Sequence, residues 1–222
     1  FLPRRVDLRE RNWGSIYDQG ALGSCVANTV AYCIRFCMRQ QNIQDNFNAS
    51  RLFIYFFSRV VANAPLNQDT GTSIRDGYKS VHHHRVCDEG LWPYVIRRFA
   101  IRPSERALQG ARQFTRFQYL AVAQNELEIK KCLKDGFPIS FGAMIFTSFM
   151  SLQASRTGVI PMPGSDRQVG GHAMTIVGYD DAKRHFIVCN SWSQKWGDGG
   201  FCYMPYAYIL DSKLCSDFWS VR

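Results

Sequence analysis

The sequence predicts an α+β fold in which a helical half precedes a β half. From about residue 24 to 115, apolar residues recur at helical spacing. From about 116 to 210, short β-branched and aromatic runs alternate with Gly, Pro and Asp. The 222 residues are enough for one large domain or two small lobes around a sizeable core.

Four helices are expected in the first half, over residues 24–42, 48–63, 72–84 and 103–114. Small polar residues that cap the free amides of a first turn stand at the start of three of them. These residues are Ser24 for the first helix, Asn48 or Ser50 for the second, and Thr72 or Ser73 for the third.

In the second half, one helix is expected over 126–136, ending at Gly136. The other segments favour strands, and residues 181–184 predict the turn of a β-hairpin. The expected strands are 117–123, 138–144, 171–180, 184–192 and 199–205.

Composition excludes several classes of protein. No apolar run approaches the roughly 18–20 residues of a membrane span, so no membrane partner is expected. The net charge is +9, but the arginines are scattered and no nucleic-acid-binding motif appears, so we expect no nucleic acid partner. The N-terminus has no apolar signal core, and any targeting segment would precede Phe1.

Eight cysteines are spread along the chain without a C-x-x-C pair. Cys33 and Cys37 share a helix face but lack a nearby histidine, which makes a zinc site a poor interpretation. We therefore expect no metal and no cofactor. If Cys25 stays free for chemistry, seven cysteines remain and cannot all pair within one chain, so the redox compartment and the localisation stay open.

The segment "GALGSCVANTVAY" places Cys25 where a glycine-containing loop meets a helix. The free amides and the positive dipole end of a first helical turn favour a thiolate. Gln19, six residues earlier, carries a side-chain amide that can point into the same cleft. Alone, a cysteine at a helix start is more often structural.

Two later residues change that balance. His172 begins an apolar strand after two glycines, and Asn190 ends the next strand and leads into Ser-Trp. Strands joined by the predicted hairpin are neighbours, so these two side chains can meet. A Cys, His and Asn in these positions form a joint signal for a nucleophilic site.

The blocks "QGALGSCVA", "GHAMTIVGY" and "NSWSQKWGDGGF" resemble the three signature segments of the papain-like cysteine peptidases, in the same order. His172 lies 172 − 25 = 147 residues after Cys25, within the roughly 130–150 typical of the family. The resemblance covers nearly the whole chain and is closer to variants from bacteria and large DNA viruses. Leu22 stands where the family usually has a second cysteine, so the disulfide made there is absent.

The resemblance implies one peptidase unit over 1–222 with the active-site cleft between two lobes. It assigns a mainly helical lobe to 13–115, a mainly β lobe to 116–212, and crossover termini to 1–12 and 213–222. The implied enzyme is a monomeric cysteine endopeptidase acting on proteins or peptides, preceded by an inhibitory pro-segment N-terminal to Phe1. Two rivals remain, a catalytically silent peptide-binding relative and an acyltransferase that uses the same residues.

The resemblance also implies a role for each site residue. Cys25 and His172 form a thiolate–imidazolium pair, Asn190 orients the imidazole, and Gln19 donates to the oxyanion. Trp192 shields the bond between His172 and Asn190. The positions that match the family's substrate-binding residues are Gly71 and Thr72 along the substrate backbone, with Ile74, Gly142 and Ala173 around a pocket for an apolar or aromatic side chain. Trp192 is also counted among these substrate-binding residues.

Overall fold

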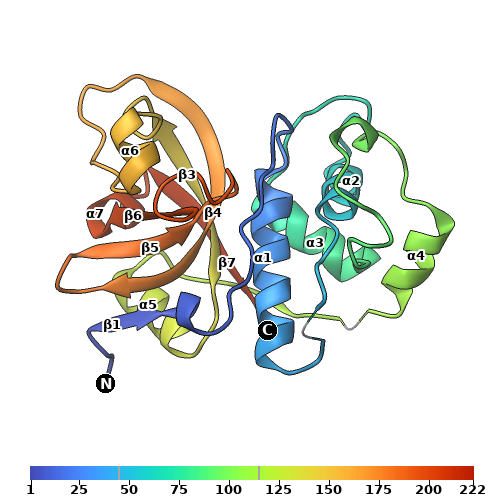
Figure 1. Cartoon of the computed structure of the whole chain (residues 1–222), viewed down its shortest axis with the longest axis horizontal. Coiled ribbons are helices and arrows are strands. Elements are labelled where there is room, and N and C mark those ends of the chain that lie inside the picture. Colours follow the sequence, from blue (N-terminus) through green and yellow to red (C-terminus); the bar gives the residue numbers. More distant parts are fainter. Residues whose placement is uncertain (45, 115) are drawn as a thin grey trace.

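The computed structural model describes residues 1–44, 46–114 and 116–222. It has two parts side by side, a helical part and an antiparallel sheet, with α1 (Cys25–Gln40) between them (Figure 1). The fold is therefore α+β with two lobes, as predicted. The lobe boundary expected at Thr115 lies outside the described residues.

The helical lobe contains α1, α2 (Arg51–Val61), α3 (Ile74–His84) and α4 (Glu105–Arg112). Ser50, Ser73 and Ser104 cap the last three, because each side chain accepts from a backbone N–H three residues later. Ser24 does not cap α1, contrary to the prediction. Its hydroxyl is 2.6 Å from the Tyr94 hydroxyl instead, so a tertiary contact takes the group that a local cap would use.

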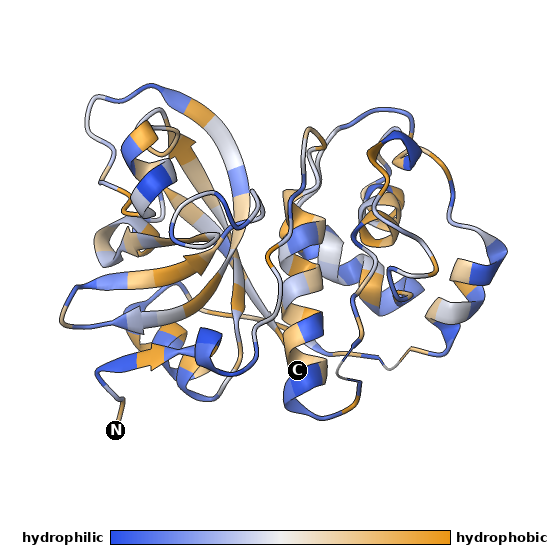
Figure 2. Cartoon of the chain, viewed as in Figure 1, coloured by the Kyte–Doolittle hydropathy of each residue, from blue (hydrophilic) through white to orange (hydrophobic). Residues whose placement is uncertain are grey.

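Apolar packing holds this lobe together. Residues 26–38 of α1 are all buried, so the helix is enclosed around its whole circumference. Hydrophilic as well as hydrophobic residues occur along this helix (Figure 2). Phe53, Tyr55 and Phe56 of α2 are buried as well. All eight cysteines are free, and all except Cys25 are buried. The lobe is thus stabilised by packing without a disulfide, at roughly 1.5–3 kcal/mol for each large side chain buried.

The sheet has the strand order β2-β7-β3-β4-β5-β6, and β1 also pairs with β4. Every pairing is antiparallel. The turn at 181–184 joins β4 to β5, as predicted. The strands are β1 (Arg5–Asp7), β2 (Tyr119–Ala121), β3 (Ile139–Phe146), β4 (Gln168–Asp180), β5 (His185–Cys189), β6 (Phe201–Pro205) and β7 (Cys215–Val221).

Several elements were not predicted. Strands β1 and β7 use the termini, and α5 (Glu126–Lys134) is joined in the second half by α6 (Leu152–Thr157) and α7 (Tyr206–Ile209), so it is not a lone helix. Short 3-10 helices cover Leu8–Glu10 and Ile96–Arg98. The strand expected over 184–192 ends at Cys189, which leaves Asn190 just beyond it. Among the described residues, no helix is long and apolar enough to cross a membrane.

Hydroxyl groups hold α1 against the sheet. Thr29 of α1 donates to the Met174 carbonyl of β4 at 3.1 Å, and its hydroxyl oxygen lies 3.0 Å from Ser140 Oγ of β3. The Tyr32 hydroxyl, one turn further on, donates to the Asn190 carbonyl at 3.2 Å. These buried bonds have defined directions, so they set the position of the helix that carries Cys25 relative to β4 and β5.

Candidate active site

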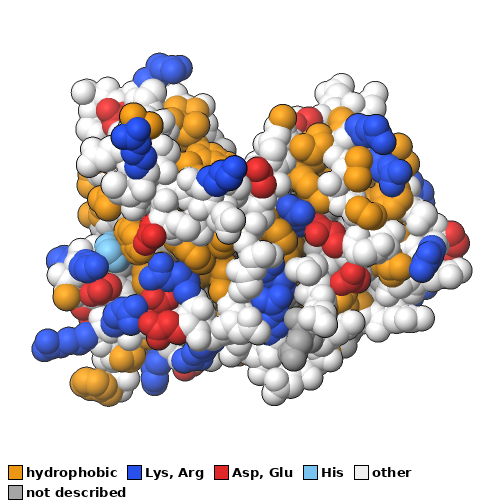
Figure 3. All heavy atoms as spheres, in the orientation of Figure 1, with side chains coloured by type: hydrophobic (Ala, Val, Ile, Leu, Met, Phe, Trp, Pro, Cys, Tyr) orange, Lys and Arg blue, Asp and Glu red, His pale blue; other side chains and the backbone are white. Residues whose placement is uncertain are grey.

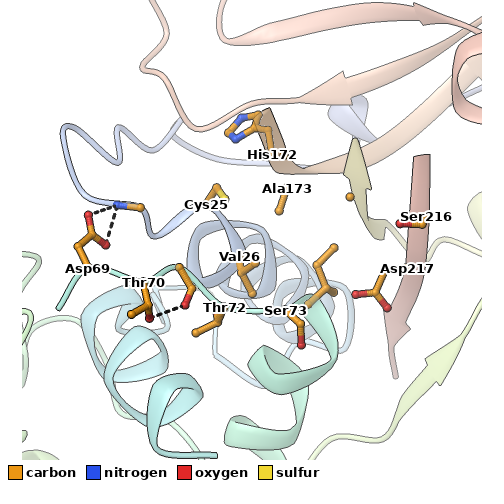
Figure 4. A pocket seen from close by; sticks show the side chains of 15 residues that line it. Cys25, Val26, Asp69, Thr70, Thr72, Ser73, His172, Ala173, Ser216 and Asp217 are labelled. Atoms are coloured by element: carbon orange, nitrogen blue, oxygen red, sulfur yellow. Dashed lines mark hydrogen bonds between the residues drawn. The ribbon is translucent and has the colours of Figure 1, made fainter. Parts of the chain in front are cut away.

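A pocket of about 580 Å³ lies between the lobes at the N-terminal end of α1. Figure 3 shows the surface hollowed between the two lobes at the top of the molecule. Both Cys25 and His172 line the pocket, and in Figure 4 the imidazole lies above the sulfur. The other lining residues are Gly23, Val26, Asp69, Thr70, Gly71, Thr72, Ser73, Ile74, Gly142, Gly171, Ala173, Ser216 and Asp217.

Cys25 is the first residue of α1 and is half-buried. Burial raises the pKa of its thiol, and the carboxylate of Asp69 acts in the same direction. Backbone N–H groups of Ala173, Val26 and Cys25 itself lower the thiol pKa. The amides of the first helical turn thus favour the thiolate as expected, but burial is the larger effect in the unliganded pocket.

The imidazole of His172 is bound to Asn190. His172 Nε2 lies 2.8 Å from Asn190 Oδ1, and the same oxygen accepts from the Ser191 backbone N–H at 2.8 Å. A backbone N–H only donates, so the amide oxygen of Asn190 faces the ring and Nε2 must carry the proton. The neutral ring therefore keeps Nδ1 as its acceptor.

Strand placement explains this contact. His172 lies on β4 opposite Ala143 of β3, and the pairing of β4 with β5 begins at Thr175 and Cys189. Asn190 follows Cys189, so it reaches His172 diagonally rather than as a direct cross-strand partner. Burial lowers the pKa of His172 to about 4, and the hydrogen bond with Asn190 opposes this shift.

Gln19 is buried beside the loop that leads to Cys25, and in the described part of the chain it is not among the residues that line the pocket. Its Nε2 donates to the Leu22 carbonyl at 3.1 Å, which leaves one N–H of the amide uncommitted. Its Oε1 accepts from Ser191 Oγ at 2.7 Å, and its backbone N–H donates to the Ser191 carbonyl. Ser191, which sequence reasoning did not single out, thus contacts both Asn190 and Gln19.

Comparison with known proteins agrees with this geometry. The chain matches the papain family cysteine protease family over residues 2–215. The chain belongs to the papain family of cysteine proteases. It is 40% identical over 214 residues to an uncharacterized peptidase C1-like protein of Acanthamoeba polyphaga mimivirus, covering 92% of this chain and 68% of that protein. It is 34% identical over 220 residues to cathepsin K of Mus musculus, covering 91% of this chain and 60% of that protein.

Solved structures give the same result. Xylellain, a cysteine protease from Xylella fastidiosa, superposes with a TM-score of 0.93 at 37% identity, covering 100% of this chain and 87% of that one. The cysteine protease CMS1MS2 of Carica candamarcensis superposes with a TM-score of 0.70 at 19% identity, covering 91% of this chain and 89% of that one. The latter shows the shared fold alone. Both curated relatives are longer than this chain, which spans about two thirds of their length.

In this papain-family chain, the indole of Trp192 packs against the imidazole of His172. The Trp192 and His172 rings stack with centroids 4.8 Å apart. Phe149 and Trp196 contact the indole edge-to-face at 5.6 and 5.3 Å, so the aromatic cover has a second layer that the sequence did not indicate. Trp192 does not line the pocket with the other predicted substrate-binding residues.

Asp69 links the segment at Gly71, which is predicted to bind substrate, to the loop that precedes Cys25. The Gly23 N–H donates to the two carboxylate oxygens of Asp69 at 3.1 and 3.0 Å (Figure 4). The Tyr55 hydroxyl donates to the same carboxylate and accepts from the Gly71 N–H at 3.2 Å. Gly71 has φ +67°, which suits glycine. Asp69 is a second residue that sequence reasoning missed, because its partners lie far away in the chain.

The three consecutive histidines at 82–84 and the segment 48–50 both lie outside the pocket that contains Cys25. His82, His83 and His84 are exposed at the end of α3, and no group of three or more His, Cys, Asp or Glu among the described residues is arranged to hold a metal ion. The Asn48 side-chain oxygen accepts from Arg35 and Tyr17, both at 3.4 Å, while Ser50 caps α2.

Proposed function

We propose that this chain is a cysteine endopeptidase that cleaves peptide bonds through an acyl-enzyme, with Cys25 as nucleophile and His172 as base and acid. The observation that carries the proposal is the His172–Asn190 bond of 2.8 Å, because it puts the proton on Nε2. Nδ1 is then the nitrogen left to take the proton of Cys25, which lines the same pocket.

The two charges of the reactive pair form together. Burial disfavours an isolated thiolate at Cys25 and an isolated imidazolium at His172. Transfer of the thiol proton to Nδ1 creates both charges side by side, and their attraction offsets the desolvation that each would suffer alone. Asn190 Oδ1 continues to accept from Nε2 in the imidazolium, so the ring keeps its orientation through the transfer.

The reaction follows from these positions. The thiolate attacks the peptide carbonyl, whose oxygen becomes an oxyanion that accepts from the uncommitted N–H of Gln19 Nε2 and from the Cys25 backbone N–H. His172 then gives its proton to the leaving amine as the C–N bond breaks. Water, deprotonated by His172, then attacks the thioester carbonyl and forms a tetrahedral adduct. The C–S bond of this adduct breaks, the carboxylic acid product leaves, and Cys25 takes the proton back from His172.

We propose that peptides bind along Gly71 and Thr72, with a side chain entering between Ile74, Gly142 and Ala173. These five residues line one pocket with Cys25. This lining supports an apolar side chain on the substrate residue that precedes the one whose carbonyl is attacked. Ser216 and Asp217 of β7 also line the pocket.

We also propose that the lobes extend over residues 13–115 and 116–212. The enzyme is proposed to be a monomer, and an inhibitory pro-segment is proposed to precede Phe1.

A cleavage profile on a peptide library, with and without an epoxide thiol trap, tests the function. We expect trap-sensitive cleavage that disappears in Cys25→Ala, with an apolar residue preferred in the pocket. Tight peptide binding without turnover in the intact chain would instead establish a silent relative. Preferential transfer of the acyl group to an added amine at ordinary water concentration would establish the acyltransferase.

A further inference from the structure

A second pocket, of about 490 Å³, lies at the C-terminal end of α3, away from the active site. Its wall is strongly basic, because six of its nine lining residues are arginine or histidine and none is Asp or Glu among the residues that the structure describes. They come from the end of α3, the segments on either side of α4, and α4 itself. The basic residues are His83, His84, Arg85, Arg102, Arg112 and Arg116.

Few of these charges are neutralised. Arg112 approaches the carboxylate of Glu105 at 3.8 Å, and both side chains are exposed, so the pair is weak. Arg85 donates to the backbone carbonyl of Arg112 rather than to a carboxylate. For Arg102 and Arg116, the described part of the chain supplies no ion-pair partner. The positive charges therefore repel one another until an anion enters.

Phe57, Val60 and Leu108 form the apolar part of the pocket lining, and one histidine packs against it. The His84 ring stacks on Phe57 of α2 with centroids 4.3 Å apart and an interplanar angle of 22°. Burial lowers the pKa of His84, and the charges of His83 and Arg102 lower it further. A negative charge in the pocket acts in the opposite direction, so binding an anion is coupled to proton uptake by His84.

We propose that this pocket binds an oligophosphate, a chain of two or three phosphoryl groups. Arginine forks match phosphate oxygens in pairs, and four arginines around one cavity can contact more than one phosphoryl group. The volume is larger than a single phosphate fills. The Phe57 face is already occupied by His84, so the pocket offers no free ring face of Phe57 for a nucleobase to stack on.

Titration calorimetry with sodium tripolyphosphate tests the proposal. The measurement uses the whole chain carrying Cys25→Ala, which prevents self-cleavage, at low ionic strength and pH 6. The test variant adds Arg102→Gln and Arg116→Gln. The matched control adds Arg97→Gln and Arg106→Gln, which removes the same charge from exposed positions outside the pocket.

We expect saturable binding near one equivalent, weakened tenfold or more in the Arg102/Arg116 variant and less than twofold in the control. Thermal melting without tripolyphosphate checks that both variants fold.

Three results would overturn the proposal. The first is no saturable heat with the parent chain. The second is equal weakening in the test and control variants, which would mean attraction by net charge alone. The third is inorganic phosphate or an acidic peptide binding as tightly as tripolyphosphate. None of these results bears on the peptidase activity.

Discussion

The two walls of the active-site cleft hold their residues in position by different means. On the β wall, His172 is held by strand pairing on β4, and Asn190 directly follows β5. On the helical wall, Gln19 and Gly71 lie in loops whose backbone groups have few strand partners. There, buried arginines supply the missing donors.

Arg35 and Arg59 illustrate this second arrangement, since both are 0% exposed and neither contacts a carboxylate among the described residues. Arg35 donates to the Trp13 and Ser15 carbonyls at 2.9 and 2.8 Å. Arg59 donates to the carbonyls of residues 66 and 68 at 2.6 and 3.2 Å, just before the substrate-binding segment. A buried guanidinium can therefore fix the backbone of a loop, as hydrogen bonds between strands fix the backbone of a sheet, because it offers five N–H donors in fixed directions.

Gln19→Ala removes a side chain that is bonded to residues of both walls, Leu22 and Ser191, and we expect it to have the largest effect. Loss of an oxyanion donor lowers kcat by about 10²–10³ with the melting temperature nearly unchanged. Ser191→Ala, which frees Gln19 Oε1 without removing the donor, should lower kcat about fivefold because a neutral hydrogen bond is worth roughly 1 kcal/mol. A large loss of stability with kcat preserved would show that Gln19 is structural.

Arg59→Met tests the arginine-held wall. We expect the free energy of unfolding to fall by about 3 kcal/mol, because several loop carbonyls lose their donor, and KM to rise as the segment at Gly71 loosens. Chemical denaturation and steady-state kinetics measure the two effects. Arg97→Met, at an exposed position, is the control and should stay within about 0.5 kcal/mol. Unchanged stability in Arg59→Met would mean that water replaces the guanidinium.

The pH dependence of stability tests the β wall. With Cys25→Ala, no thiolate is present, and His172 has a pKa of about 4 in the folded chain against 6.5 for an unperturbed histidine. Between these values the unfolded chain binds the extra proton, so stability falls as the pH falls below 6.5. The loss is about 2 kcal/mol by pH 5, at roughly 1.4 kcal/mol per pH unit.

Denaturant titrations at several pH values measure this slope. Other groups titrate in the same range, so Cys25→Ala/His172→Gln serves as the reference and should lack the His172 contribution. Identical slopes in the two proteins would show that His172 is not desolvated as the structure indicates.

Asp69→Ala should have the smallest effect. It releases Gly23 from the substrate-binding segment, and a net loss of about 1 kcal/mol corresponds to a KM increase of roughly fivefold with little change in melting temperature. Asp69→Asn keeps an oxygen acceptor for the Gly23 N–H and should restore part of the loss. If Asn and Ala are equally impaired, the charge of Asp69 matters rather than the link that it forms.

Most of the residues that we propose as catalytic could be singled out from the sequence because each lies in a short segment with its own local pattern. Cys25 begins a helix, and His172 and Asn190 belong to neighbouring strand segments joined by a recognisable turn, although β4 begins at Gln168 and not at residue 171 as predicted. Ser50 and Ser73 cap helices within three residues, which is also local information.

The residues that escaped prediction depend on distant partners. Ser191 acts on Gln19 from 172 positions away, and Asp69 binds Gly23 from 46 positions away. Strand β1 has only three residues, and its partner in β4 is more than 170 residues later. Strand β7 includes Asp217 at φ +64°, which interrupts the alternation that identifies a strand.

Helix α3 joins the active-site pocket to the basic pocket. Ile74 at its first turn lines the former, and His84 at its last turn lines the latter. Eleven residues of helix span only about 16 Å. Thermodynamic reciprocity then applies to any coupling that the helix transmits: an anion that tightens peptide binding by some factor must itself bind tighter, by the same factor, when the peptide is present. The abundance of substrate would thus regulate occupancy of the basic pocket as much as the anion regulates the protease.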